Sequence, residues 1–187
     1  MEKLKKDILA LMRQVYPGDD RVIVFGEGPR GAKLMLIGEA PGQQEALMGR
    51  PFVGKAGRNL DAYIEATGLR REEMYISNTV KFRPTKISPA GRTVNRTPTQ
   101  EEIAMFLPFL KREIELVTPA VIVTLGNVPL KALAGDKATI GELHGRKMQA
   151  GGRTVFPMYH PASLIYNPSL KPVYAVDMAE LAKIVEN

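Results

Sequence analysis

Hydrophobic positions along the chain form two kinds of pattern, short continuous runs and longer stretches in which they recur every three or four residues. The continuous runs are rich in β-branched residues and are bounded by Gly, Pro or Asp, so they predict strands. The predicted strands cover residues 21–26, 33–38, 74–78, 120–126 and 153–159. The periodic stretches predict amphipathic helices over residues 1–15, 56–69 and 97–117.

The order of these elements predicts an α/β fold. Strands that are almost continuously hydrophobic and alternate with helices belong to a central parallel sheet covered on both faces. A chain of 187 residues suits one domain, which we expect to span residues 1–187. Binding sites in such folds lie at the carboxyl ends of the strands. The loops that leave those ends, and that we expect to form one rim, cover residues 38–55, 78–98, 126–128 and 159–169.

Composition narrows the chemistry available at that rim. The sequence has no cysteine and 2 histidines, which excludes disulfides, thiolate metal sites and a cysteine nucleophile. Any reaction must therefore use carboxylates, a histidine, amides and backbone groups. No apolar run reaches the roughly 18 residues of a membrane span, and the charged first helix does not resemble a signal peptide. We therefore expect a cytoplasmic protein without membrane contact.

The distribution of charge indicates a polyanionic partner. The net charge is +6 and the pI is about 9.5, a bias that favours association with nucleic acid. Residues 81–96 contain five basic side chains and no acidic one, and residues 145–176 contain four basic side chains and no acidic one. Both segments overlap the predicted rim. Solvated surface loops would give the same pattern, so charge alone leaves both interpretations open.

Four side chains at the strand ends are candidates for chemistry: Glu39, Phe52, Asn78 and His160. Each also has an ordinary structural alternative. Glu39 could face solvent or cap a helix, and Phe52 could pack in the core beneath its loop. Asn78 could form a turn, and His160 could be a structural histidine. Taken together they place a carboxylate, an aromatic face, a carboxamide and an imidazole at one rim. A carboxamide can read the edge of a nucleobase and an aromatic ring can stack on its face.

Six ordered motifs give the chain a resemblance to a known family. These are "GEAPG", "GRPFVGKAG", "ISNTVKFRP", "NRTPTQEE", "VIVTLG" and "HPASL", spread between about residues 22 and 171. In this order and spacing they resemble the family 4 uracil-DNA glycosylases. The resemblance implies a three-layer α/β/α sandwich around a four-stranded parallel sheet. It also implies a monofunctional DNA N-glycosylase without lyase activity, which acts on single- or double-stranded uracil-containing DNA and which we expect to be a monomer.

The resemblance also assigns roles to individual residues. Glu39 would activate the attacking water and His160 would support charge on uracil O2, which makes these two the catalytic residues. Phe52 would stack on the flipped uracil, Asn78 would bind its Watson–Crick edge, and Glu45 would crowd C5 and so exclude thymine. The small residues that let the base approach the backbone are Gly38, Ala40 and Gly42. The expected DNA-binding residues are Lys81, Arg83, Arg92, Arg96, Ser163, Leu164 and Ile165.

Two of these DNA-binding residues, Leu164 and Ile165, are candidates for an apolar wedge in the DNA stack, although helix packing explains them nearly as well. In the long loop before residue 98, some relatives carry a histidine that becomes covalently trapped on DNA. The nearest residue here is Asn95, so we expect ordinary turnover.

The chain departs from the family in lacking cysteine. Family 4 enzymes usually hold a 4Fe-4S cluster through four cysteines, and two of those positions here are Phe82 and Phe106. We therefore expect no metal and no cofactor. We expect instead that Phe82, Phe106 and an apolar residue of the first helix, such as Leu11 or Met12, form a small hydrophobic cluster.

Two other functions remain open at this stage. The first is a catalytically slow protein that recognises damaged DNA without releasing a base. The second is a glycosylase for another deaminated base, such as hypoxanthine.

Overall fold

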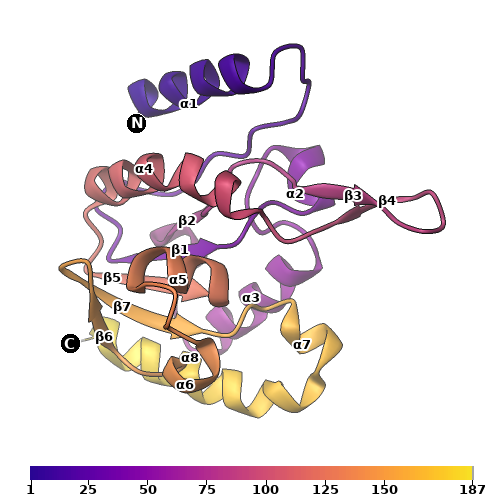
Figure 1. The fold of residues 1–187 in the computed structure, drawn as a ribbon. Helices are drawn as coiled ribbons and strands as arrows, with labels where there is room; N and C mark the ends of the chain where they lie inside the picture. Colours follow the sequence, from indigo (N-terminus) through magenta and orange to yellow (C-terminus); the bar gives the residue numbers. More distant parts are fainter. Residues whose placement is uncertain (187) are drawn as a thin grey trace.

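The computed structural model describes residues 1–186, which form three layers with a sheet between two layers of helices (Figure 1). The sheet has the strand order β2-β1-β5-β7-β6. Its four parallel strands are β1 (Leu34–Gly38), β2 (Tyr75–Asn78), β5 (Val121–Leu125) and β7 (Arg153–Met158). Strand β6 (Met148–Ala150) adds an antiparallel edge beside β7. The predicted α/β sandwich is confirmed, and β6 is an antiparallel strand beyond the four parallel strands that the family resemblance implies.

The central strands are buried on both faces, which explains their continuous hydrophobic runs. On β1, Leu34 and Leu36 belong to the core beneath α3 (Lys55–Ala66) and α8 (Lys171–Glu186). The alternate residues Met35 and Ile37 belong to the core beneath α4 (Gln100–Val117). Successive side chains of a strand point to opposite faces, so a strand with helices on both sides needs apolar residues at every position.

Helix α4 begins with a capping box. The Thr99 hydroxyl accepts a hydrogen bond from the Glu102 amide at 3.2 Å, and the Glu102 carboxylate accepts one from the Thr99 amide at 2.8 Å. Arg96 donates to both oxygens of the same carboxylate, at 2.6 and 2.7 Å. These contacts satisfy backbone groups that the first turn leaves free and tie the preceding loop to the helix.

A third hydrophobic cluster joins α1 (Glu2–Val15) to α4 and to the segment after β2. It contains Leu4, Ile8, Met12, Val80, Phe82 and Phe106. The rings of Phe82 and Phe106 meet edge to face with centroids 5.7 Å apart, and both side chains are fully buried. Of the two residues suggested for the first helix, Met12 lies in this cluster. The two positions at which the family resemblance implies cysteines thus hold a packed aromatic pair, which does not fit an iron–sulfur cluster.

Replacing Phe82 with serine should lower the free energy of unfolding by about 3–5 kcal/mol, the usual cost of truncating a buried phenylalanine. The loop after β2 should also become more sensitive to limited proteolysis, because its anchor is lost. Thermal melting and proteolysis of the wild type and the variant measure both effects. Ile87→Ser is the matched control, since Ile87 is exposed in the same loop. An unchanged melting temperature for Phe82→Ser would contradict the anchoring role.

Two segments differ from the prediction. Residues 21–26 form no strand, and their neighbour Glu27 makes an isolated antiparallel bridge to Ile76. Their apolar side chains Ile23 and Phe25 pack against the α1 cluster, so the pattern reflects burial and not pairing in the sheet. The expected irregular segment before residue 98 contains a hairpin of β3 (Thr85–Ile87) and β4 (Thr93–Asn95), which projects from the body (Figure 1).

The remaining helices are short. They are α2 (Gln43–Met48), η1 (Arg71–Glu73), α5 (Asn127–Ala134), α6 (Ile140–Leu143), α7 (Ser163–Tyr166) and η2 (Pro168–Leu170). Within residues 1–186, no helix is both long enough and apolar enough to span a bilayer.

Candidate active site

A cavity of about 540 Å³ lies at the carboxyl edge of the sheet, where the expected rim loops meet. Its lining comes from the loops after β1, α2 and β7, the helices α2, α3 and α7, and the ends of β2 and β4. Seven of the residues singled out in the sequence line it: Ala40, Gly42, Glu45, Phe52, Asn78, His160 and Ile165. Its size suits a small planar ligand such as a nucleobase.

The floor of the cavity depends on the absence of a side chain at Gly38. Gly38 pairs with Asn78 across β1 and β2, and a Cβ atom on Gly38 would lie 2.5 Å from the Phe52 ring and closer still to the Asn78 carboxamide. Only glycine leaves room for both side chains. The Phe52 ring also lies 5.7 Å, centroid to centroid, from the ring of His160. An aromatic face, a carboxamide and an imidazole therefore converge on one small volume.

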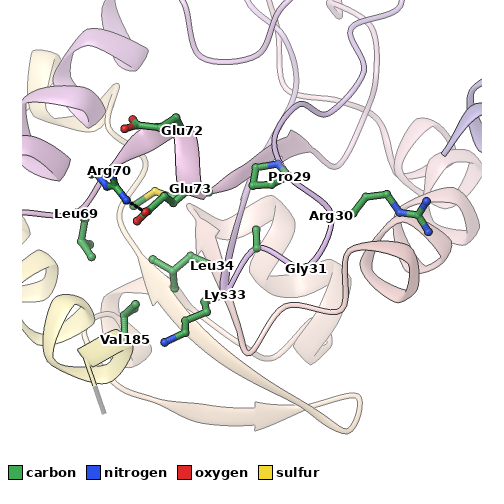
Figure 2. A pocket seen from close by; sticks show the side chains of 12 residues that line it. Pro29, Arg30, Gly31, Lys33, Leu34, Leu69, Arg70, Glu72, Glu73 and Val185 are labelled. Atoms are coloured by element: carbon green, nitrogen blue, oxygen red, sulfur yellow. Dashed lines mark hydrogen bonds and ion pairs between the residues drawn. The ribbon is translucent and has the colours of Figure 1, made fainter.

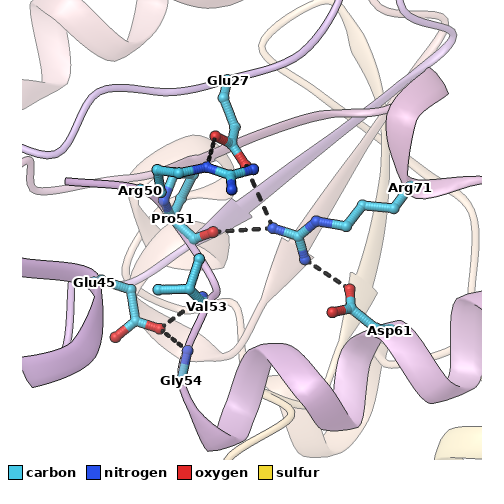
Figure 3. Close-up of polar contacts among 8 residues, drawn as sticks. All are labelled: Glu27, Glu45, Arg50, Pro51, Val53, Gly54, Asp61 and Arg71. Carbon is cyan, nitrogen blue, oxygen red and sulfur yellow. Dashed lines mark hydrogen bonds and ion pairs between the residues drawn. The ribbon is translucent and has the colours of Figure 1, made fainter. Parts of the chain in front are cut away.

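Phe52 is held in an uncommon backbone conformation. Its φ angle is +52°, a value that residues other than glycine rarely adopt. Glu45 holds the following residues, because one carboxylate oxygen accepts hydrogen bonds from the amides of Val53 at 3.0 Å and Gly54 at 2.8 Å (Figure 3). The other oxygen accepts from the Gly42 amide at 3.1 Å. Glu45 thus clamps the two turns that form one wall of the cavity.

A network of arginines and carboxylates supports the same loop from the other side (Figure 3). Arg71 donates to the Pro51 carbonyl at 3.0 Å and to Asp61 at 2.7 Å. Glu27 accepts from Arg50 at 2.9 Å and lies 3.6 Å from Arg71. A strained residue persists where its surroundings leave it no alternative. The two sets of contacts supply that constraint on both sides of Phe52.

The geometry fixes the protonation of His160. Burial is the main cause that lowers its pKa, to about 4, and the nearby Glu45 carboxylate offsets this in part. The ring is therefore neutral near pH 7. Its Nδ1 accepts a hydrogen bond from the Ala162 amide at 3.1 Å, so the proton of the neutral ring sits on Nε2. His160 can therefore donate a hydrogen bond without carrying charge.

Glu39 lies in the chain between Gly38 and the lining residue Ala40, but it is not itself among the residues that line the cavity. Its side chain is half-buried, and this burial raises the pKa of the carboxyl, while a contact with the Thr97 side chain lowers it in part. A carboxylate whose pKa is raised toward neutrality is a stronger base than a solvated one. The raised pKa therefore makes Glu39 a better proton acceptor than a solvated glutamate.

Three of the expected DNA-binding residues are placed differently. Lys81 is 1% exposed and lies 2.6 Å from Glu113, so a phosphate cannot reach it and this prediction is wrong. Leu164 is 2% exposed and belongs to the core, so it packs inside the fold, as the helix-packing alternative expected, and cannot act as the wedge. Arg96 is half-buried and stabilises the start of α4 through Glu102. The sequence pattern could not show these contacts, because each depends on residues brought together by the fold.

Other residues line the cavity without having been assigned to the pocket, among them Lys55, Tyr166 and Asn95. Lys55 is exposed at the start of α3, and Tyr166 is 86% exposed at the end of α7. Asn95 reaches the cavity from β4, and its side-chain oxygen accepts a hydrogen bond from Arg83 at 2.6 Å. The lysine of "GRPFVGKAG" and the aromatic residue that follows Ile165 are the signals that could have identified the first two.

A second cavity, of about 470 Å³, lies at the opposite ends of β1 and β2 (Figure 2). It is bordered by the turn that includes Pro29 and Gly31 and by a mixture of acidic and basic side chains, among them Arg70, Glu72 and Glu73. None of the candidate residues named above for catalysis or substrate binding is among the described residues that line it. The candidate chemistry is therefore concentrated at the carboxyl edge of the sheet.

Comparison with known proteins shows the family of the chain. The family model for the uracil DNA glycosylase superfamily matches residues 25–181. The chain is 34% identical over 193 residues to a type-4 uracil-DNA glycosylase of Sulfurisphaera tokodaii, covering 98% of this chain and 84% of that protein. It is 41% identical over 149 residues to a type-4 uracil-DNA glycosylase of Thermotoga maritima, covering 79% and 73%.

A solved structure supports the fold. The crystal structure of wild-type SMUG2 from Pedobacter heparinus superposes with a TM-score of 0.56 at 16% identity, covering 100% of this chain and 85% of that one. At this identity the likeness concerns the fold alone. The family match and the identities to curated relatives go further: the chain belongs to the uracil-DNA glycosylase superfamily and, within it, to the type-4 enzymes, of which it is a member without cysteine.

Proposed function

We propose that this protein hydrolyses the N-glycosidic bond of a deoxyuridine flipped out of DNA and leaves an abasic site, as a monofunctional glycosylase in base excision repair. The observation that carries the proposal is the convergence of Phe52, Asn78 and a neutral His160 on one cavity. An enzyme that cuts this bond must first take the base out of the stack and hold it in a fitted pocket.

The proposed role of His160 follows from the charge that the reaction creates. As the glycosidic bond breaks, the base departs with negative charge and the sugar becomes oxocarbenium-like. A hydrogen-bond donor fixed beside the base oxygen stabilises that charge without having to reorganise. The Nε2–H of His160 is such a donor, because Nδ1 is already held by the Ala162 amide. Phe52 supplies the face on which the base stacks.

Glu39 is proposed to position and activate the attacking water. Glu39 immediately precedes Ala40, which lines the cavity, and is not itself a lining residue, so this role leaves the cavity free for the base. In the ionised form it also stabilises positive charge developing on the sugar, as a carboxylate does in other glycoside hydrolyses. The raised pKa of Glu39 supports the basic role.

Selection of uracil is assigned to Asn78 and Glu45. Among the described residues, no hydrogen bond to another residue occupies the Asn78 carboxamide, so its donor and acceptor remain available to a base edge. Glu45 is proposed to exclude thymine through the wall that it fixes, because its carboxylate oxygens are bound to backbone amides. A rigid wall cannot yield to the additional methyl group of thymine.

DNA is proposed to bind across the mouth of the cavity. Basic side chains neutralise phosphates regardless of sequence, and exposed apolar or aromatic side chains can occupy the vacated stack. Ile165 is 43% exposed and adjoins Tyr166 on α7, so we assign the wedge to this pair in place of Leu164. The other proposed contacts are Arg83, Arg92, Ser163 and Lys55.

A base-release assay tests the proposed function. Oligonucleotides of one sequence carrying uracil, thymine, cytosine or hypoxanthine are incubated with the protein and then treated with alkali to cleave abasic sites. We expect release of uracil from single- or double-stranded DNA and none of thymine. Binding to uracil-containing DNA without release would indicate a damage-recognition protein. Faster release of hypoxanthine than of uracil would indicate a glycosylase for that base.

A further inference from the structure

A buried ion pair lies directly behind the candidate site. Lys81 is 1% exposed and Glu113 is 3% exposed, and the Lys81 Nζ lies 2.6 Å from the Glu113 Oε2. The pair joins the segment after β2 to the C-terminal half of α4. Neither residue lines the candidate cavity, and the proposed reaction uses neither.

Lys81 contacts the main chain of Asn78, a residue that lines the cavity. Its Nζ donates hydrogen bonds to the Asn78 carbonyl at 2.8 Å and to the Ser77 hydroxyl at 2.7 Å. With Glu113 this accounts for all three protons of the ammonium group. Asn78 ends β2, and a buried carbonyl without a partner is costly. Lys81 supplies that partner.

Glu113 is equally constrained. Its carboxylate also accepts hydrogen bonds from the Tyr75 hydroxyl at 3.0 Å and from the Ser77 hydroxyl at 2.9 Å. Two side chains of β2 and one from the segment after it thus converge on one carboxylate of α4. The end of β2 is therefore fixed to α4 by a fully hydrogen-bonded network.

Stability alone is a poor explanation for this arrangement. Removing two charges from water is costly, and well-packed apolar residues of similar volume often stabilise a fold as well as a buried ion pair does. What apolar residues would lack is a directional donor at the Asn78 carbonyl. The network defines the position of the main chain from which the Asn78 carboxamide extends into the cavity.

We propose that Lys81, held by Glu113, is a positioning residue that sets the Asn78 carboxamide for recognition of the base. The inference rests on the proposed function, since it assumes that Asn78 binds uracil. It replaces the expected contact between Lys81 and DNA phosphate with a role inside the fold.

The test uses a double variant, Lys81→Met/Glu113→Gln, which removes both charges together and leaves neither one buried alone. Inhibition of base release by free uracil measures the base pocket, and affinity for abasic-site DNA measures the rest of the interface. We expect the melting temperature to stay within a few degrees of the wild type. Inhibition by uracil should weaken about tenfold, the effect of losing one well-placed contact, with affinity for abasic DNA unchanged.

Two further variants sharpen the test. Arg112→Met/Asp7→Asn removes an ion pair of 2.7 Å on the outer side of the same helix and should leave uracil inhibition unchanged. Lys81→Gln/Glu113→Gln also removes both charges but keeps an N–H donor near the Asn78 carbonyl. The Lys81→Gln/Glu113→Gln variant should recover part of the inhibition by uracil. If the methionine variant does not fold, this glutamine variant is compared with the wild type in its place.

The outcomes separate this inference from the proposed function. Wild-type inhibition by uracil in a folded Lys81→Met/Glu113→Gln variant would overturn the positioning role while leaving the proposed function intact. A wild-type protein that releases no uracil would overturn the proposed function, and the positioning role with it.

Discussion

Glu39→Gln should release uracil about 10²–10⁴ times more slowly than the wild type, the usual range for removing a general base. Glutamine keeps the size and hydrogen-bonding capacity of the side chain but can neither accept the proton of the attacking water nor carry negative charge toward the sugar. Single-turnover rates with excess protein measure this step directly. The melting temperature should change little, because the side-chain contact recorded for Glu39 is a hydrogen bond with Thr97, which glutamine can also form.

The pH dependence provides an independent check on Glu39. Burial raises the pKa of this carboxyl, and the reaction needs its ionised form. The wild-type rate should therefore fall as the pH drops through the raised pKa, at a higher pH than for a solvated glutamate. The residual rate of Glu39→Gln should lack that decrease. A wild-type rate that is constant down to pH 4 would contradict the role of Glu39 as the base.

His160→Ala should lower the rate of uracil release by about 10²–10³, the effect of removing one donor to a developing negative charge. The donor is the Nε2–H of a neutral ring whose pKa is lowered to about 4. Because the ring is already neutral well below pH 7, the wild-type rate should not decline between pH 6 and 8 through loss of a proton from His160. NMR titration of the imidazole measures the pKa directly.

The second histidine provides the control for this prediction. His144 is the other histidine of the chain and contacts Asp177 at 2.9 Å, and neither residue lines the cavity. His144→Gln should leave the rate of uracil release close to that of the wild type. If the wild-type rate fell as the pH rose through about 6.5, the ordinary pKa of histidine, the active form of His160 would instead be the charged one.

Much of the fold and of the site follows from local patterns. The four parallel strands were predictable because strands covered on both faces need uninterrupted apolar sequence, and β1 and β5 show this. The positions of Phe52, Asn78 and His160 followed from the rule that sites form at the carboxyl ends of such strands. These inferences depend on a few neighbouring residues and on general topology.

The remaining features depend on contacts distant in sequence. In the sequence, Lys81 is one of several basic residues in a loop. Only the folded chain brings it into contact with Glu113, which lies 32 positions later. Leu164 and Ile165 are adjacent in sequence and similar in chemistry, yet one is buried and the other exposed. Which face of α7 meets the core cannot be inferred from four helical residues. The role of Glu45 as a clamp was hidden for the same reason, since its partners are the backbone amides of a separate turn.

The aromatic pair of Phe82 and Phe106 has a consequence for how the protein matures in a cell. The layer formed by α1 and α4 is complete once the chain has folded, because its interior consists of side chains encoded in the sequence. A protein without cysteine cannot acquire a thiolate-bound cluster. Its supply of folded molecules should therefore be independent of iron delivery, and exposure to air or to chelators during purification should not unfold it.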